Sequence, residues 1–139
     1  MRYDLPFLHD FAVELGFGVE RDGTSLLIDL GEGAVLSFVN AERDEDCLIG
    51  FVDAPWHFHG ATLAFSDPRG HYVELDQLTL LEGLARGSVL ICSRIVSGVV
   101  DDRWLSHAEF NDEFRYLEVA DHLLVRRAAL PETPSAKVG

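Results

Sequence analysis

Apolar residues recur along the chain at two different spacings, and each spacing predicts a different kind of element. Phe7, Leu8, Phe11 and Leu15 lie three or four positions apart, which is the period of a helix with one buried face. In residues 24–30 the even-numbered positions from 26 onward are apolar, which is the pattern of a strand with one buried face. The N-terminal part of the chain therefore predicts a short helix followed by strands.

The same patterns predict more strands than helices in the rest of the chain. A second helix is predicted over residues 75–86, and a short third helix from Ser106 to about Asp112, where Ser106 and a glutamate three positions later match a capping box. A turn is predicted at Asp101-Asp102, and the last two strands are expected to form a hairpin. The predicted strands cover residues 18–21, 24–30, 34–40, 47–52, 62–66, 72–74, 88–100, 114–119 and 123–128.

Short connections between many strands favour antiparallel pairing. We therefore expect an α+β fold, with a single domain over residues 1–130, a largely antiparallel, curved sheet and two or three helices packed on one face. Residues 131–139 are small, polar and proline-containing, and they are predicted to form a flexible C-terminal tail. A chain of 139 residues has the usual length of one domain.

The charge of the chain narrows the choice of partners. Asp and Glu number 24 against 11 Lys and Arg, so the formal net charge is −13. Because a field of this sign repels phosphates, we expect neither nucleic acid nor an anionic membrane as a partner. The same field accelerates encounter with cationic surfaces, and a basic protein is therefore the expected partner.

Cysteine usage and the N-terminus predict a cytoplasmic location. Cys47 and Cys92 both lie in apolar runs, which is typical of buried, reduced thiols. The first residues lack the apolar core of a secretory signal. No stretch approaches the roughly 18 apolar residues that a membrane-spanning helix needs.

Two histidines separated by a single residue form the most unusual pattern in the chain. In extended backbone the side chains of His57 and His59 point to one face, and with the nearby Asp53 they suit a divalent transition metal. The pair is similar to the paired histidines of cupins, which are metal-binding β-barrels. A cupin places a glutamate four or five residues after the second histidine, where this chain has Leu63 and Ala64, so we do not carry that family over. The alternative is that both rings are loop residues bonded to the backbone.

Motifs for catalysis are incomplete in the sequence. It has no G-x-S-x-G and no glycine-rich phosphate loop, and its single lysine, Lys137, lies in the predicted tail. Glu74, at the end of an apolar strand, is the best single candidate for a general acid or base. An enzyme is therefore the less favoured class, and its most concrete form is a metal-dependent enzyme or metal-binding domain that uses His57 and His59 with a carboxylate.

Aromatic residues next to acidic ones are the candidates for a partner-binding surface. Trp56 and Trp104 are the predicted anchors, because tryptophan surrounded by charge is typical of interface hot spots. Two acidic runs supply the predicted steering charges, namely Asp44, Glu45, Asp46, Asp101 and Asp102. The alternative is that both tryptophans belong to the core of a small domain.

In size, charge and lack of a catalytic motif, the chain resembles the immunity proteins that neutralise basic bacterial toxins such as nucleases. This resemblance implies a protein that binds its partner and occludes it. The leading hypothesis is therefore an acidic binding module for a basic partner. The alternatives are the metal site and a structural subunit that functions as a homodimer through an exposed strand edge.

Overall fold

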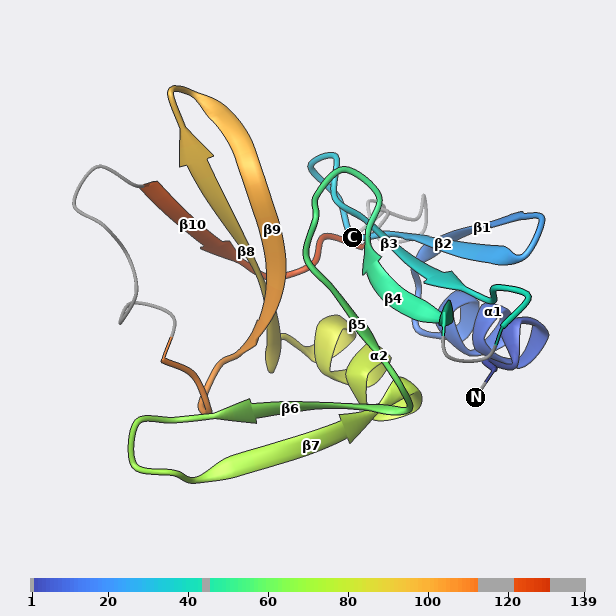
Figure 1. The fold of residues 1–139 in the computed structure, drawn as a ribbon, viewed down its shortest axis with the longest axis horizontal. Helices are drawn as coiled ribbons and strands as arrows, with labels where there is room; N and C mark the ends of the chain where they lie inside the picture. Colours follow the sequence, from blue (N-terminus) through green and yellow to red (C-terminus); the bar gives the residue numbers. More distant parts are fainter. Residues whose placement is uncertain (1, 44–45, 113–121, 131–139) are drawn as a thin grey trace, which may run out of the picture.

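The computed structural model describes residues 2–43, 46–112 and 122–130 of the chain. Within these residues it contains two helices and ten strands, and all the strand pairs are antiparallel (Figure 1). The chain is thus a single α+β domain, as the sequence predicts. Its strands form three sheets rather than one curved sheet.

The elements follow one another along the chain in the order of their labels. Their bounds are α1 Leu5–Glu14, β1 Gly18–Asp22, β2 Ser25–Asp29, β3 Val35–Val39, β4 Leu48–Phe51, β5 His57–His59, β6 Thr62–Ser66, β7 Tyr72–Asp76, α2 Gln77–Arg86, β8 Val89–Val96, β9 Val99–His107 and β10 His122–Arg126. The largest sheet has the order β1-β2-β3-β4-β5, the second has the order β10-β8-β9, and β6 and β7 form a third sheet of two strands. No helix in the described part of the chain is long and apolar enough to cross a membrane.

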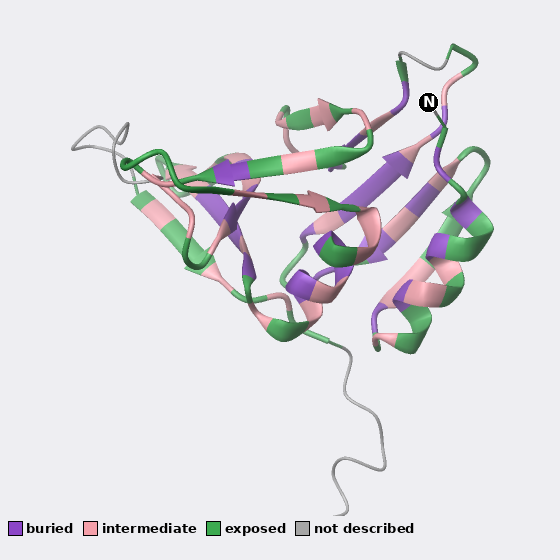
Figure 2. Cartoon of the chain, turned by 90° about the horizontal axis from the view of Figure 1, so that it is seen from below, coloured by how far each residue is buried: buried purple, intermediate pink, exposed green. Residues whose placement is uncertain are grey.

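One face of the five-stranded sheet builds the core, and we call it the inner face. Leu26, Phe38 and Ile49 lie opposite one another on neighbouring strands and are almost fully buried. Both helices add buried side chains to this core, and their outward sides are exposed (Figure 2). These helix residues are Leu5, Leu8, Ala12, Leu80, Leu81 and Leu84.

The opposite face of this sheet, which we call the outer face, carries a different row of residues. Cross-strand pairing places Glu20, Leu27, Ser37, Gly50 and His57 directly opposite one another, one on each strand. Because side chains alternate between the faces of a strand, this row points away from the core. An acidic residue therefore stands at one edge of the outer face and a histidine at the other.

The second helix begins where the β6–β7 hairpin ends. The sequence predicts helix from residue 75, but the chain remains in β7 as far as Asp76, which caps the helix through a bond from the Thr79 N–H. The helix ends at Gly87, whose φ of +90° is left-handed and costs a glycine little. The prediction of this helix is confirmed apart from its first two residues.

The second sheet corrects three predictions. Residues 88–100 form not one strand but most of a hairpin, because Ser97 and Gly98 both have positive φ and make a two-residue turn. Asp101-Asp102 and Ser106 belong to β9, so the predicted turn and third helix are wrong. Ser106 is buried opposite a residue of β8, and this pairing overrides its local capping signal.

The last predicted hairpin is described only in part. Its first strand, residues 114–119, lies outside the described residues, as does the predicted tail at 131–139. Its second strand corresponds to β10, which pairs with β8, so that Val125 lies opposite the buried Cys92. β8 is therefore the central strand of its sheet.

The cap of α2 provides a test of the fold. Replacing Asp76 by Ala removes the acceptor of the Thr79 N–H and is expected to lower the free energy of unfolding by about 1 kcal/mol at neutral pH. Asp76→Asn, which keeps an acceptor, should lose much less. The Thr79 N–H bond also holds the pKa of the Asp76 carboxyl below its usual value, so this stabilisation should fade as the pH drops into the acid range. Urea unfolding at several pH values measures both effects, and equal losses for the two variants would contradict the capping role.

Candidate functional site

A hollow lies on the outer face, over β1, β2 and the turn between β2 and β3. Its volume is about 700 Å³. Its apolar lining includes Leu27, Val35 and Val52. Its acidic lining consists of three exposed residues, Glu20, Asp29 and Glu32. We call it the acidic hollow.

The three carboxylates of the acidic hollow come from three different positions in the local fold. Glu20 stands on β1 directly opposite Leu27. Asp29 ends β2, and its carboxylate accepts the Gly31 N–H at 2.8 Å. Glu32 lies in the following turn with a positive φ of 52°. The sequence analysis overlooked these residues, although the pairing of Glu20 with an apolar position in the β1–β2 hairpin could have revealed one of them.

The two predicted anchors line a single, smaller hollow. Trp56 and Trp104 are far apart in sequence, yet both border a space of about 240 Å³ whose lining also includes Phe65, Phe110 and Asp112. Both tryptophans are half-buried, and Trp56 packs against the core cluster. We call this space the tryptophan hollow. The sequence leaves open whether the two tryptophans are partner-binding anchors or core residues. In the structure each tryptophan is half-buried and also borders this hollow.

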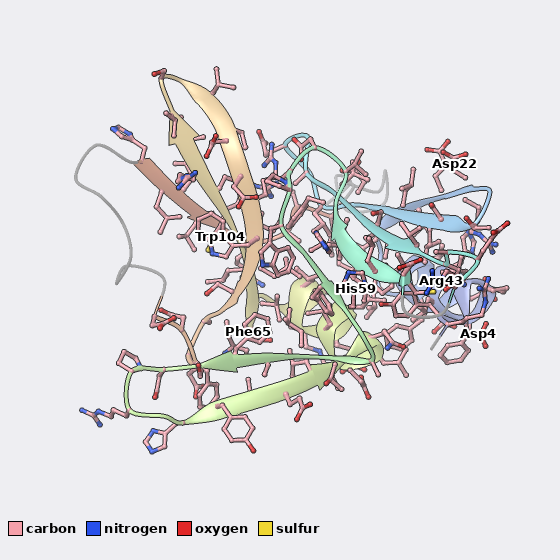
Figure 3. The ribbon with its side chains drawn as sticks, viewed as in Figure 1. Asp4, Asp22, Arg43, His59, Phe65 and Trp104 are labelled. Carbon is pink, nitrogen blue, oxygen red and sulfur yellow. The ribbon has the colours of Figure 1, made fainter. Side chains whose placement is uncertain are left out.

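The predicted steering charges do not form one surface. Asp44 and Glu45 lie outside the described residues, and Asp46 is exposed just before β4. Arg43, beside this run, lies across the molecule from Trp104 (Figure 3). Asp46, whose N–H donates to the Arg43 carbonyl oxygen, is therefore remote from the tryptophan hollow.

The second acidic run is engaged in bonds within the protein. Asp101 forms an ion pair with Arg94 across the β8–β9 hairpin. Asp102 accepts the backbone N–H of Trp56 at 3.2 Å and that of Arg103 at 2.9 Å. These contacts assign both carboxylates a structural task and leave the acidic hollow as the stronger candidate for charge recognition.

The histidine pair lies on β5, which is an edge strand of the largest sheet. His57 and His59 are both exposed and their rings are 5.2 Å apart, so the expected common face is present. Phe58, between the two histidines, and Trp56, just before them, point the other way and pack against the core. Alternation along one short strand therefore separates apolar rings from imidazoles.

The predicted third ligand is not part of this pair. The Asp53 carboxylate receives the Nε–H of Arg103, at 3.2 and 3.1 Å from its two oxygens. Among the residues that the structure describes, no three His, Cys, Asp or Glu side chains are placed to hold a metal ion. The expected set of His57, His59 and Asp53 is thus not assembled, because a buried arginine fifty positions away takes the carboxylate.

The candidate general acid or base, Glu74, and the two cysteines lie in three different elements or segments of the fold. Glu74 is exposed on β7, and one of its oxygens accepts the Thr62 hydroxyl at 2.6 Å. Cys47 and Cys92 are both buried and form no disulfide, as the sequence predicts. The bond from Thr62 fixes the Glu74 carboxylate across the β6–β7 hairpin.

A histidine that the sequence analysis did not single out lies next to the tryptophan hollow. His107 contacts the rings of Phe65 and Phe110 in a tilted arrangement, with ring centroids 5.7 and 5.2 Å away. Its Nδ1 accepts the backbone N–H groups of Glu109 and Phe110 at 3.1 and 3.3 Å. Burial lowers the pKa of His107, and the nearby charge of Glu109 opposes this shift by a smaller amount. The neutral ring therefore holds the wall of the hollow in place.

Comparison of the chain with protein-family models, with curated proteins and with solved structures gave no match. The geometry described above is therefore the basis for a functional proposal.

The bonds of His107 predict a pH-dependent stability. Because the pKa of His107 is lowered in the folded state, the unfolded chain takes up this proton at a higher pH than the folded chain does. The contribution of His107 to the free energy of unfolding is therefore fully present above the pKa that this residue has in the unfolded chain. It decreases as the pH drops below that pKa. His107→Asn keeps an acceptor but cannot titrate in this range, so its unfolding free energy should vary less between neutral and mildly acidic pH. Chemical unfolding at several pH values measures the slopes, with the exposed His71→Asn as the control, and equal slopes for His107→Asn and wild type would refute the prediction.

Substitution of Arg103 is expected to lower the stability of the fold much more than substitution of Arg86. Its side chain is only 9% exposed and donates to Asp53 and to the Ser93 hydroxyl, whereas the Arg86 side chain is 76% exposed and pairs loosely with Glu82. Arg103→Met is expected to cost about 1.5–3 kcal/mol, as for hydrogen bonds to charged groups. Arg86→Met should cost less than about 1 kcal/mol, as for other surface pairs. Thermal and urea unfolding compare the two, and similar losses would show that the Arg103 contacts are not needed for stability.

Proposed function

We propose that this chain is a binding protein that docks a basic protein partner and occludes it, with the acidic hollow as the contact surface. The observation that carries the proposal is the convergence of Glu20, Asp29 and Glu32 around an apolar floor. A surface of this kind fits a segment in which Lys or Arg side chains flank apolar ones.

Affinity and selectivity would come from different parts of the acidic hollow. The side chains of Leu27, Val35 and Val52 provide apolar area that can be removed from water when a partner packs on them. The surrounding carboxylates select cationic side chains and repel anionic ones. The formal net charge of −13 extends this selection beyond contact distance, because it raises the rate of encounter with a basic protein.

The tryptophan hollow is the second candidate contact surface, with Trp56 and Trp104 as its anchors. Most of its lining residues are apolar, and the only carboxylate among its described lining residues is that of Asp112. Charge complementarity to a basic partner therefore favours the acidic hollow. A cytoplasmic setting belongs to the same proposal, and the two buried cysteines without a disulfide support it, because reduced cysteines are typical of that compartment.

A matched pair of double variants tests the contact surface. Glu20→Gln with Glu32→Gln removes two charges from the acidic hollow, and Glu14→Gln with Glu42→Gln removes two exposed charges outside it. A basic protein captured at low salt is identified and purified, and its association and dissociation rates are measured with each form. We expect the first variant to lower the association rate by on the order of tenfold and the second to change it little.

Two results would contradict the proposal in different ways. If the association rate does not respond to ionic strength, the partner is not selected by charge. If Trp104→Ala weakens binding and the two charge variants behave alike, the contact surface is the tryptophan hollow instead. Circular dichroism spectra of all variants establish that they are folded.

A further inference from the structure

We propose that His57 and His59 form a binding site for one divalent transition-metal ion, ligated through the Nε2 atoms of both rings. The site uses no carboxylate of this chain. It is independent of the proposed docking of a basic partner, since neither histidine lines the acidic hollow or the tryptophan hollow.

The backbone of β5 presents both imidazoles to solvent. His57 and His59 lie opposite Gly50 and Leu48 of β4, so their side chains share the outer face. A side chain on Gly50 would meet the Cβ of His57 at 2.8 Å, which shows how closely the histidine lies over β4. β5 is an edge strand, and the side of the pair away from β4 is not covered by another strand of this sheet.

Hydrogen bonds fix which nitrogen of each ring is available. The Nδ1 of His57 lies 2.9 Å from the Pro55 carbonyl oxygen, and the Nδ1 of His59 lies 2.8 Å from that of Cys47. A carbonyl oxygen only accepts, so each Nδ1 carries a hydrogen, and in the neutral ring the lone pair is then on Nε2. Metal-ligating histidines almost always donate their second nitrogen in this way. Two neighbouring rings with the same arrangement are therefore prepared for ligation.

The spacing of the rings also suits a shared ion. A zinc ion about 2.0–2.1 Å from each Nε2 would lie roughly 3.2 Å from each ring centre, which at a tetrahedral angle separates the two centres by roughly 5 Å. The observed separation is 5.2 Å, and the ring planes are nearly perpendicular, at 84°. The separation of the two ring centres therefore matches that of two imidazoles bound to one tetrahedral ion.

The donor set decides the class of metal. Two imidazoles favour Cu²⁺, Ni²⁺ and Zn²⁺ over Mg²⁺ and Ca²⁺, and Cu²⁺ binds most tightly in this series. Because Asp53 is held by Arg103, the remaining coordination positions are open to water or to a donor from another molecule. The site is thus of the open kind, in which a bound ion can accept an external ligand.

Titration with Cu²⁺ tests the site on tag-free, metal-free protein. Calorimetry should show one ion bound per chain, and the electron paramagnetic resonance spectrum should show splitting from two nitrogens. We expect His57→Ala or His59→Ala to weaken Cu²⁺ binding at least tenfold and the double variant at least a hundredfold. The control double variant His9→Ala with His71→Ala should leave the dissociation constant within twofold.

Several outcomes overturn the proposal. Unchanged Cu²⁺ affinity in the His57→Ala, His59→Ala double variant places the ion elsewhere, and one ion per two chains makes the site a bridge between copies. Nitrogen-15 spectra of the metal-free protein test the tautomers directly, and a hydrogen on Nε2 of either ring would remove the basis of the site. The Glu20→Gln, Glu32→Gln variant should bind Cu²⁺ like wild type, so failure of the docking surface and failure of the metal site are separate results.

Discussion

The ion pair between Arg103 and Asp53 joins the two larger sheets, and the segment that carries Trp56 and leads into the histidine pair depends on it. Arg103 stands on β9, donates to the Ser93 hydroxyl of β8, and holds Asp53 in the segment that follows β4. The neighbouring Asp102 accepts the N–H of Trp56 at the other end of that segment. Two consecutive residues of one strand thereby fix residues 53–56, and with them the start of β5. A buried guanidinium needs such partners, because an unpaired charge in the interior is strongly destabilising.

A second arginine supports the acidic hollow from behind. Arg126, at the end of β10, donates to the carbonyl oxygens of Leu30 and Gly31 in the turn that carries the acidic residues. Burial lowers the pKa of Arg126, with a further contribution from Arg103, while the charges of Glu32 and Asp29 act in the opposite direction. The turn between β2 and β3 therefore faces solvent with negative charge and the interior with positive charge. This arrangement keeps its carboxylates apart from the core while holding its backbone in place.

Local signals in the sequence were sufficient for the first third of the fold and insufficient for β9. The helical spacing of apolar residues from Phe7 to Leu15 and the alternation in residues 24–30 predict α1 and β2, because each of these signals acts within a few residues. In β9, Asp102 and Ser106 carry turn and cap signals, but pairing with β8 decides their conformation. The same limit applies to the sites. Alternation predicted that both histidines share a face, whereas the capture of Asp53 by a residue fifty positions away has no local signal.

Gly50 has a consequence for recognising relatives of this chain. An added Cβ there would lie 2.8 Å from the Cβ of His57 and 2.9 Å from the carbonyl oxygen of Trp56, so no other amino acid fits while β5 stays on β4. Geometry, and not chemistry, therefore sets the residue at this position. A homologue that keeps the edge strand and the length of the segment before it therefore requires a glycine seven positions before the residue in the place of His57. The motif Gly-x₆-His-x-His is thus a short signature by which such chains can be sought.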